Sequence, residues 1–557
     1  MSLSVAAVHQ YADDVLSGEI VACRYVILAC KRFKDDLENG HKRGLWFDER
    51  AAQYALDFYD LTRHVKGELA GQPIELEPWQ GFIIANIFGW KWKETGLRRF
   101  RTAYNEVARK NAKSTLSSGI GLFMTGFDGE GGPEVYSAAT SKDQAKIVFG
   151  DARRMALGSP ALKKRLEILK HDIEDEHVGG RFRALASDAD NLDGLNPHCA
   201  IVDELHAHKT REVWDVLETA VGARTQPLLW AITTAGFNRE GICYEIRGYV
   251  VKILEGSIED DTTFGIIYTL DEGDDWRDPD VWIKANPNLG VSVKPDDIAR
   301  LAKKAEATPT ALNNFLTKRL NIWCNAATAW LNMDDWHKCP DIPDDDYLAT
   351  LPCWAGVDLA QKLDLAASIK VFLDDDKVYV KPRFYLPENA IGRKQGSLGN
   401  LYRTWADAGY LTLTEGDSID YDVIEDDIRA DLERYDIQEV CFDPWGAIQI
   451  CQNLMKDGAP VIHVQMTVKN LSEPMKELES LIIQGRFHHP RNPVLDWNAS
   501  NVVAKVDAND NIFPRKETAD NKIDGIVAII LALFRALLHE PEPSAARVYA
   551  TRGIRTL

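Results

Sequence analysis

The sequence lacks the marks of a secreted or membrane-spanning protein. Its nine cysteines form no Cys-x-x-Cys pair, so we read them as reduced core or surface thiols of a cytosolic protein. The first residues, Met1–Asp14, are mixed in character and end acidic, which is not the pattern of a signal peptide. The longest apolar run, Gly525–Phe534, is followed by Arg535 and falls far short of the ~20 residues that a membrane span needs.

The chain also lacks an excess of positive charge. Lysine and arginine number 65 against 85 for aspartate and glutamate, which gives a formal net charge of −20. This balance argues against a uniformly basic DNA-coating protein, but it allows a local basic channel, because binding depends on where the charge lies. At 557 residues, with 45% apolar and 27% charged residues, the chain is too long for one core and predicts two or three globular domains.

One short segment departs from this acidic average. Six basic residues fall within sixteen positions, against the single acid Glu106: Arg98, Arg99, Arg101, Arg109, Lys110 and Lys113. Such a patch is either a solvated basic face or a surface that faces the phosphates of ATP and of DNA. The sequence favours the second interpretation, in which part of the patch faces ATP and part faces DNA.

A loop that matches part of the phosphate-loop pattern GxxxxGK[ST] lacks both glycines. In Val107–Thr115, Val107 and Ala112 occupy the glycine positions, while Lys113 and Ser114 match the Lys-[Ser/Thr] pair. In such loops the lysine reaches the β- and γ-phosphates, the hydroxyl holds Mg²⁺, and backbone N–H groups and the helix start cradle the anion. From this stretch alone, a basic loop leading into a helix is an equally good interpretation.

A short apolar run about ninety residues later ends in two acids. Cys199–Glu204 reads Cys-Ala-Ile-Val-Asp-Glu, as expected of a buried parallel strand. Asp203 at its carboxyl end would act on the Mg²⁺ held by Ser114, and Glu204 would be the base that orients the attacking water. The alternative is a strand followed by a helix N-cap, since aspartate often caps helices.

A third element follows the acidic strand. Leu228–Gly236 is another apolar run, and it ends in Thr233 and Thr234. Hydroxyls at the end of a strand beside a phosphate site suit a sensor of the γ-phosphate. Strands that alternate with helices predict a parallel α/β sheet, with the ligand at the carboxyl ends of the strands. The three elements in this order favour a nucleotide site.

The second half of the chain carries acids at the ends of several predicted elements. Two strands, Trp354–Asp358 and Ala366–Leu373, form a predicted hairpin, the strand Glu439–Asp443 follows, and Lys522–Phe534 is a predicted helix. Carboxylates on separate elements suit a nuclease in which two Mg²⁺ or Mn²⁺ ions stabilise the attacking and leaving oxygens. The order of strand acid, later strand acid and helix acid resembles a ribonuclease H-like arrangement. Taken singly, each acid could also be an exposed loop residue or a cap. The four acids are Asp358, Asp364, Asp443 and Asp524.

Together these motifs resemble the large terminase subunit of tailed double-stranded DNA phages. The resemblance rests on a phosphate loop that lacks glycines but contains Arg109, on Val202–His206, and on Thr233–Gly236. It implies an α/β protein with an N-terminal P-loop ATPase domain of the ASCE type, built on a parallel sheet, and a C-terminal ribonuclease H-like nuclease domain. In that family ATP hydrolysis drives double-stranded DNA into a procapsid, and the nuclease cuts the concatemeric genome.

The resemblance also implies roles for particular residues. Arg109 would stabilise the γ-phosphate in the transition state, and Lys522 would contact the scissile phosphate. Trp79 and Gln80 resemble the family's adenine-recognition element. The alternative is a helix that starts with Pro78 at its first position, but the order of the motifs and the distance to Lys113 favour the functional interpretation. The predicted nucleotide-binding residues are Trp79, Gln80, Arg109, Lys110, Asn111, Ala112, Lys113, Ser114, Thr115, Asp203, Thr233 and Thr234. The predicted catalytic residues are Glu204, Arg109, Lys113, Asp358, Asp443 and Asp524. The predicted metal ligands are Ser114 and Asp203 in the ATPase, and Asp358, Asp364, Asp443 and Asp524 in the nuclease.

The expected organisation and partners follow from the same resemblance. The cofactors are ATP with Mg²⁺ and, in the nuclease, Mg²⁺ or Mn²⁺. The partners are double-stranded DNA, the portal protein and procapsid, a small terminase subunit, and further copies in a homo-oligomeric ring, expected to be a pentamer, with no membrane. The site of action is the host cytoplasm, transiently at the portal vertex. A helicase-like or DNA-repair ATPase with an accessory nuclease is the alternative, but helicases normally carry two ATPase cores. The expected segments are a helical segment 1–70, the ATPase domain 71–330, a linker 331–350, the nuclease domain 351–540 and a flexible tail 541–557.

Overall fold

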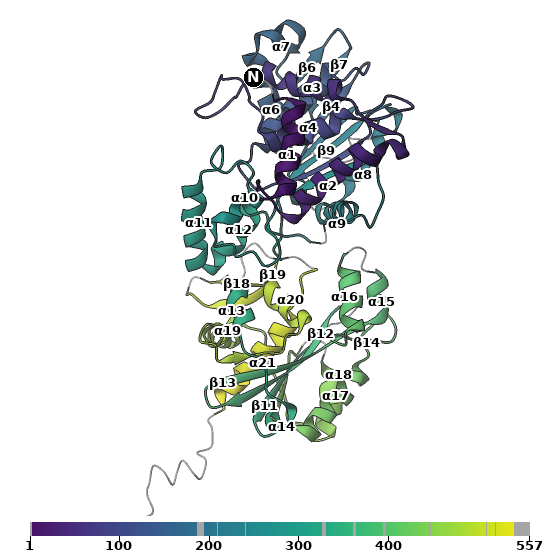
Figure 1. The fold of residues 1–557 in the computed structure, drawn as a ribbon. Coiled ribbons are helices and arrows are strands. Elements are labelled where there is room, and N and C mark those ends of the chain that lie inside the picture. Colours follow the sequence, from purple (N-terminus) through teal and green to yellow (C-terminus); the bar gives the residue numbers. More distant parts are fainter. Residues whose placement is uncertain are drawn as a thin grey trace, which may run out of the picture. The chain divides into compact units, whose positions relative to one another are not determined.

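The computed structural model divides into two compact units, Met1–Cys324 and Asn325–Leu557 (Figure 1). No described helix is long and apolar enough to cross a membrane. The residues that the structure describes are 3–185, 194–208, 210–239, 241–325, 330–359, 364–393, 397–444, 447–507, 509–517 and 520–539.

The described part of the first unit is built on an eight-stranded sheet in the order β10-β3-β9-β8-β4-β7-β6-β5. The strands from β10 to β7 are parallel, and β6 and β5 continue the sheet as antiparallel neighbours. All five residues of β8 are buried, as expected for a parallel strand covered on both faces. The strands are β3 (Thr102–Glu106), β4 (Glu134–Ala138), β5 (Glu167–Ile168), β6 (Asp172–Asp175), β7 (Gly180–Ala184), β8 (Cys199–Asp203), β9 (Leu228–Thr233) and β10 (Thr263–Ile267).

This strand order brings the predicted motifs together at one edge of the sheet. The strand β9 lies between β3, which leads into the phosphate loop, and β8, which carries the two acids. Glu106 pairs with Thr233, and Asp203 pairs with Ile232, so the three carboxyl ends lie level with one another. The expected α/β fold with a largely parallel sheet is confirmed for this unit.

The helices at the start of the chain share one apolar core with this sheet. The helix α4 is buried on all sides, which fits its uniformly apolar sequence. The segment 1–70 therefore packs directly on the nucleotide-binding fold. The helices of this part are α1 (Val5–Ser17), α2 (Arg24–Asn39), α3 (Glu49–Phe58), α4 (Pro78–Gly89), α5 (Lys113–Gly126), α6 (Lys142–Gly158), α7 (Pro160–Arg165), α8 (Glu212–Ala220) and α9 (Ile242–Leu254). The small strands β1 (Leu45–Phe47) and β2 (Trp90–Trp92) form an antiparallel pair. Short 3-10 helices are η1 (Gly40–Arg43), η2 (Tyr59–Leu61), η4 (Leu205–Ala207), η5 (Val221–Ala223) and η6 (Pro279–Val281).

A second apolar core within the first unit belongs to residues 270–320, which we call the helical layer. It contains α10 (Trp282–Ala285), α11 (Pro295–Ala307) and α12 (Pro309–Arg319), which lie together in Figure 1. At its end the chain returns to the sheet, because the carbonyl of Lys318 accepts a hydrogen bond from the backbone N–H of Arg109 at 3.0 Å. The helical layer therefore touches the phosphate loop.

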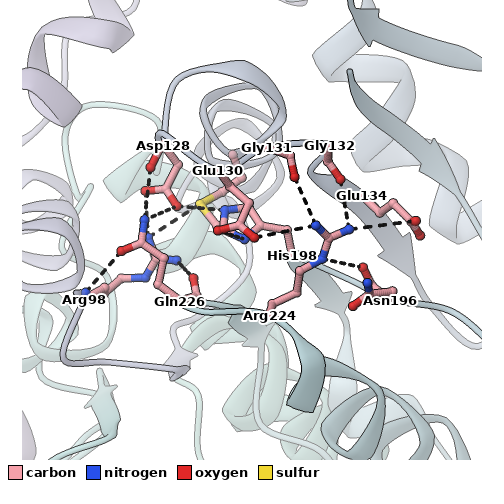
Figure 2. Close-up of polar contacts among 11 residues, drawn as sticks. Arg98, Asp128, Glu130, Gly131, Gly132, Glu134, Asn196, His198, Arg224 and Gln226 are labelled. Atoms are coloured by element: carbon pink, nitrogen blue, oxygen red, sulfur yellow. Dashed lines mark hydrogen bonds and ion pairs between the residues drawn. The ribbon is translucent and has the colours of Figure 1, made fainter. Parts of the chain in front are cut away.

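A buried ionic cluster lies where β3, β8 and β9 begin, at the end of these strands opposite the predicted nucleotide site. Figure 2 shows its polar contacts. Asp128 lies 2.8 Å from the guanidinium of Arg98 and 2.8 Å from Nε2 of His198. Burial alone would raise the pKa of Asp128, but the charge of Arg98 and the hydrogen bond to His198 outweigh it and lower this pKa. Gln226 donates to the Asp128 carbonyl, and Arg224 donates to the carbonyls of Gly131 and Gly132. We call Arg98, Asp128, His198 and Gln226 the Asp128 cluster.

Two members of the basic patch are therefore structural. Arg98 belongs to the Asp128 cluster, and Arg99, fully buried, pairs with Asp36 at 2.6 Å and Asp261 at 2.5 Å. Neither is available to ATP or DNA, because buried guanidiniums need these carboxylates to offset their desolvation. For these two residues the prediction of a phosphate-facing patch is wrong.

The described part of the second unit contains a seven-stranded sheet in the order β14-β13-β12-β11-β15-β16, with β17 paired to β13. Strands β11, β12 and β13 form an antiparallel meander, while β15 and β16 run parallel to β11. The helix α21 packs on β11 and β12. The strands are β11 (Pro352–Asp358), β12 (Ala366–Asp374), β13 (Lys377–Pro387), β14 (Thr412–Thr414), β15 (Asp436–Phe442), β16 (Val461–His463) and β17 (Phe487–His488), and a separate hairpin joins β18 (Val502–Val506) to β19 (Ile512–Lys516). The helices are α13 (Met333–Lys338), α14 (Asp345–Leu348), α15 (Glu388–Arg393), α16 (Ser397–Asp407), α17 (Tyr421–Arg434), α18 (Ile448–Lys456), α19 (Val468–Ile483), α20 (Pro493–Asn501) and α21 (Asp524–Leu538).

The interval 331–350, expected as a linker, holds α13 and α14. Trp336 on α13 is fully buried in the core of the second unit, and its indole N–H donates to Asp496 at 2.7 Å. His489 stacks on the same indole ring. A fragment of the second unit must therefore begin before this tryptophan. The expected tail 541–557 lies outside the described residues.

Candidate nucleotide and nuclease sites

The phosphate loop joins β3 to α5 and adopts a glycine-type backbone without glycines. Lys110 has φ 75° and Ala112 has φ 56°, both in the left-handed region. Ala112 stands where the pattern has its second glycine, so the backbone keeps the shape that the pattern requires. A left-handed residue with a Cβ costs roughly 1–2 kcal/mol, which the contacts around the loop must offset.

Asn111 holds this loop in place from within. Its side chain is fully buried, and its Nδ2 donates to the carbonyl of Ala108 at 3.1 Å and to Oδ1 of Asn286 at 3.0 Å. Its Oδ1 accepts from the backbone N–H of Asn288 at 3.0 Å. We call these three asparagines the amide clamp. The Asn111 side chain is thus used to shape the loop, and the contact of this residue with phosphate stays a prediction.

Three cations gather around the loop. Lys113 begins α5, and its Nζ donates to the carbonyls of Val107 at 2.9 Å and Ala108 at 3.2 Å. Burial, together with the charges of Arg109 and Lys318, lowers the pKa of Lys113 to about 8. Burial and the charge of Arg109 lower the pKa of Lys318 to about 8 as well. The lowered pKa of Lys113 beside Arg109 is typical of a site that binds an anion.

The two acids at the end of β8 differ in their surroundings. Burial and the charge of Glu204 raise the pKa of Asp203 to about 7. Burial would also raise the pKa of Glu204, but the His206 ring, 3.1 Å from its carboxylate, and the charge of Lys113 lower it to about 2. Glu204 therefore stays ionised, as a base requires, whereas the buried charge of Asp203 calls for a cation.

The two threonines after β9 contact a residue that sequence reasoning did not single out. The backbone N–H of His206 donates to Oγ1 of Thr233 at 3.0 Å, and Thr233 donates to the carbonyl of Thr234 at 2.9 Å. The His206 ring also lies 3.4 Å from the Thr234 hydroxyl and 2.9 Å from Nζ of Lys318. His206 was visible only as part of the run Val202–His206, and Lys318 carries no signal in its own helix.

The predicted adenine element lies at the start of α4. Pro78 occupies the first turn, and the side-chain oxygen of Gln80 accepts from the backbone N–H of Glu77 at 3.0 Å as half of a capping box. Trp79 donates its indole N–H to Oδ1 of Asn288 at 2.6 Å, which connects this element to the amide clamp. A cavity of about 220 Å³ opens beside it, lined by Trp79, Tyr268, Lys284 and Pro287 among others. Both residues have structural roles, and their contact with adenine stays a prediction.

The second unit brings its acids together from separate elements. Asp358 ends β11, and Asp443 directly follows β15; Val357 pairs with Phe442, so the two acids leave adjacent strands side by side. Asp524 is the first residue of α21. The close approach of that helix depends on a glycine, because a Cβ added to Gly356 would lie 1.9 Å from the carbonyl oxygen of Ala528.

The electrostatics of these acids suit a cation site. Burial and the charges of Asp524 and Asp443 raise the pKa of Asp358 well above its ordinary value. Burial and the charge of Asp364 raise the pKa of Asp524 to about 6. The buried Oδ2 of Asp524 has no hydrogen-bond partner. Buried carboxylates that repel one another are suited to binding divalent cations, because a cation would offset both their desolvation and their mutual repulsion.

Two lysines accompany the acids. The Nζ of Lys522 lies 2.7 Å from Oδ1 of Asp364, so the residue expected to meet the scissile phosphate is paired with a carboxylate. The charge of Lys516 on β19, which sequence reasoning missed, opposes the rise that burial causes in the pKa of Asp358 and of Asp524 without reversing it. Among the described side chains, no three His, Cys, Asp or Glu converge as a finished metal cage.

Comparison with known proteins finds two successive domains, with a boundary inside the first compact unit. A family model described as the ATPase domain of the terminase large subunit matches residues 78–252, and one described as its endonuclease domain matches residues 257–540, which includes the helical layer. Protein YmfN of Escherichia coli K12 is 40% identical over 382 residues, covering 66% of this chain and 83% of the relative. The large terminase subunit of Enterobacteria phage HK97 is 29% identical over 477 residues, covering 84% and 92%.

The HK97 large terminase is also known as a crystal structure. It superposes with a TM-score of 0.43 and 26% identity, covering 87% of this chain and 99% of that one. Because the endonuclease model alone spans more than half of the chain, with the ATPase model beside it, the chain belongs to the large terminase subunits, the phage DNA-packaging proteins that combine an ATPase domain with an endonuclease domain.

Proposed function

We propose that the first unit hydrolyses ATP at the edge of the sheet formed by β3, β9 and β8. Lys113 neutralises the β- and γ-phosphates, and Arg109 supplies delocalised charge to the phosphoryl group as it leaves. Glu204 orients the attacking water and accepts its proton. Mg²⁺, when bound, neutralises charge on the phosphate oxygens, and Ser114 and Asp203 are the residues that would hold it.

We propose that the second unit cleaves DNA at the acids of β11, β15 and α21. Asp358, Asp443 and Asp524 would hold Mg²⁺ or Mn²⁺, with Asp364 as a further ligand. Bound there, the metals supply charge to the attacking and leaving oxygens of the phosphodiester. The raised pKa of Asp358 and the unpartnered oxygen of Asp524 support this assignment. Lys522 would exchange its carboxylate for the scissile phosphate.

The partners that we propose follow from membership of the family. The substrate is double-stranded DNA, which a ring of subunits, expected to be a pentamer, drives through the portal into a procapsid. A small terminase subunit would deliver the genome, and assembly would take place in the host cytoplasm at the portal vertex. The chemistry supports this division of labour, because the proposed ATPase and nuclease residues lie in different compact units.

The observation that carries the proposal is this separation, and it gives a crossed test in the full-length chain. Glu204→Gln should stop ATP turnover and spare metal-dependent plasmid cleavage. Asp358→Ala should abolish cleavage and leave ATP turnover near wild type. Two exposed acids serve as matched controls, Glu212→Gln near the ATPase strands and Asp436→Ala at the start of β15. Cleavage by Asp358→Ala at the wild-type rate would refute the nuclease assignment, and normal turnover by Glu204→Gln would refute the base.

A further inference from the structure

A chain of three side chains joins the helical layer to the acid proposed as the base. Lys318 is on α12, the last helix of the layer. Its Nζ lies 2.9 Å from Nε2 of His206, and Nδ1 of the same ring lies 3.1 Å from Oε2 of Glu204. The chain therefore runs from the helical layer through one imidazole to the carboxylate.

The donors and acceptors in this chain fix the proton on the ring. The ammonium of Lys318 has only donors, so Nε2 of His206 must accept. A neutral imidazole that accepts at Nε2 carries its proton at Nδ1, and this N–H donates to Oγ1 of Thr233 at 3.0 Å while it lies 3.1 Å from Oε2 of Glu204. The Oε2 atom of Glu204 is buried without a hydrogen-bond partner, so the imidazole lies beside the oxygen that is proposed to meet the attacking water.

Thr233 holds the same edge of the ring that faces Glu204. Oγ1 of Thr233 lies 3.0 Å from Nδ1, accepts from the His206 backbone N–H at 3.0 Å, and donates its own proton to the carbonyl of Thr234. The His206 side chain is 10% exposed. A flipped ring would place a carbon against Lys318, so the contacts favour one orientation and one tautomer.

We propose that Lys318 and His206 are positioning residues for Glu204, and that through them ATP hydrolysis depends on where the helical layer lies against the phosphate loop. The inference rests on the proposed role of Glu204 as the base. The carbonyl of Lys318 also accepts from the backbone N–H of Arg109 at 3.0 Å. Movement of α12 away from the sheet would therefore release Arg109 and the His206 ring in one step. Neither positioning residue touches the reacting atoms.

The test measures turnover and nucleotide affinity separately in the full-length chain. General-base catalysis contributes roughly 10²–10⁴-fold to a rate, and loss of positioning forfeits part of it, so Lys318→Met should lower kcat about 10- to 100-fold. The Kd for a fluorescent ATP analogue should stay within about threefold, because no phosphate contact is lost. Lys318→Arg keeps a charged donor and should retain more turnover than Lys318→Met. Lys303→Met, on the exposed side of α11, is the matched control and should match wild type.

A double substitution separates a relay from two independent effects. His206→Asn can still offer an amide N–H near the position of Nδ1, but it has no group at the position of Nε2. In that background Lys318→Met should cause no further loss, because the residues act through one another. Losses that multiply would overturn the relay, as would wild-type kcat in Lys318→Met. An equal loss of affinity and turnover would make Lys318 a phosphate ligand instead.

Glu204→Gln distinguishes failure of the inference from failure of the proposed function. If Glu204→Gln turns over normally, the base is misassigned, and the relay falls with it. If Glu204→Gln is inactive while Lys318→Met is normal, only the relay is refuted. Thermal unfolding of each variant accompanies the kinetics, so a misfolded Lys318→Met is recognised and His206→Asn and Lys318→Arg then decide the question.

Discussion

Asp128→Asn should destabilise the first unit without touching its chemistry. The substitution keeps the shape of the side chain and removes its charge. In the wild type the side chains of Asp128 and Arg98 are 8% and 3% exposed and lie 2.8 Å apart. After the substitution the guanidinium of Arg98 remains buried with its carboxylate gone. The proposed ATP site lies at the opposite end of the strands, so turnover per folded molecule should not change.

The magnitude follows from the burial of the pair. Removing one partner of a buried ion pair costs about 3–5 kcal/mol, because the other charge is left desolvated. Unfolding entropy is about 2.1 cal/mol/K per residue, which gives roughly 0.7 kcal/mol/K for a unit the length of Met1–Cys324. The transition of the first unit should therefore fall by about 4–7 °C at neutral pH.

The effect should depend on pH in a defined direction. The pKa of Asp128 is lowered in the folded state, so its stabilisation is complete above the unfolded value of about 3.9. It is lost as the pH falls through the folded pKa, because the protonated acid no longer offsets Arg98. The difference between wild type and Asp128→Asn should therefore be constant from pH 5 to 7 and shrink below about pH 4.

Differential scanning calorimetry of the full-length chain measures the drop in melting temperature and its dependence on pH, with the transition of the second unit as an internal reference. The surface pair of Asp172 and Arg181, 2.7 Å apart with an arginine 46% exposed, gives the control Asp172→Asn. That change should cost less than about 1 kcal/mol, as exposed pairs do. A melting temperature of Asp128→Asn within about 1 °C of wild type would refute the reasoning, and so would a gap that persists unchanged in acid.

Two further predictions concern the second unit. Gly356→Ala should reduce plasmid cleavage by at least about tenfold and leave ATP turnover unchanged, because the new Cβ forces α21 and its Asp524 away from Asp358; full cleavage by this variant would mean that the close approach is not needed. Added Mn²⁺ should stabilise the second unit by about 2.7 kcal/mol at a hundredfold excess over Kd, and its melting temperature should rise accordingly. Asp358→Asn should show a much smaller rise, and an equal rise would place the metal elsewhere.

The motifs could be predicted because each lies in one short stretch. β8 and β9 are continuous apolar runs that end in predicted site residues, Asp203 and Thr233, and such runs are typical of buried parallel strands. The acids Asp358 and Asp443 end neighbouring strands in the same way. The family resemblance then predicted an ATPase domain followed by a nuclease domain, and the two observed sheets confirm the α/β fold class.

The supporting residues could not be predicted, because their partners are far along the chain. Asn111 meets Asn286 at a separation of 175 residues, and His206 meets Lys318 at 112. Neither contact leaves a period or a local motif. The phosphate-facing role predicted for Arg98 was wrong for a related reason. Its carboxylate partner, Asp128, is thirty positions away, outside the short window in which the charges were counted.

The amide clamp sets a limit on how the ATPase can be divided. The match to the ATPase domain ends at residue 252, whereas the loop that it contains is shaped by Asn286 and Asn288. A fragment that stops at the end of that match would keep every motif residue from Lys113 to Thr234 and lose the two amides that offset the left-handed backbone. Its loop would then relax toward ordinary dihedral angles and away from the phosphates. The smallest piece that can bind nucleotide is therefore longer than the piece that carries the signature, and it extends through the helical layer.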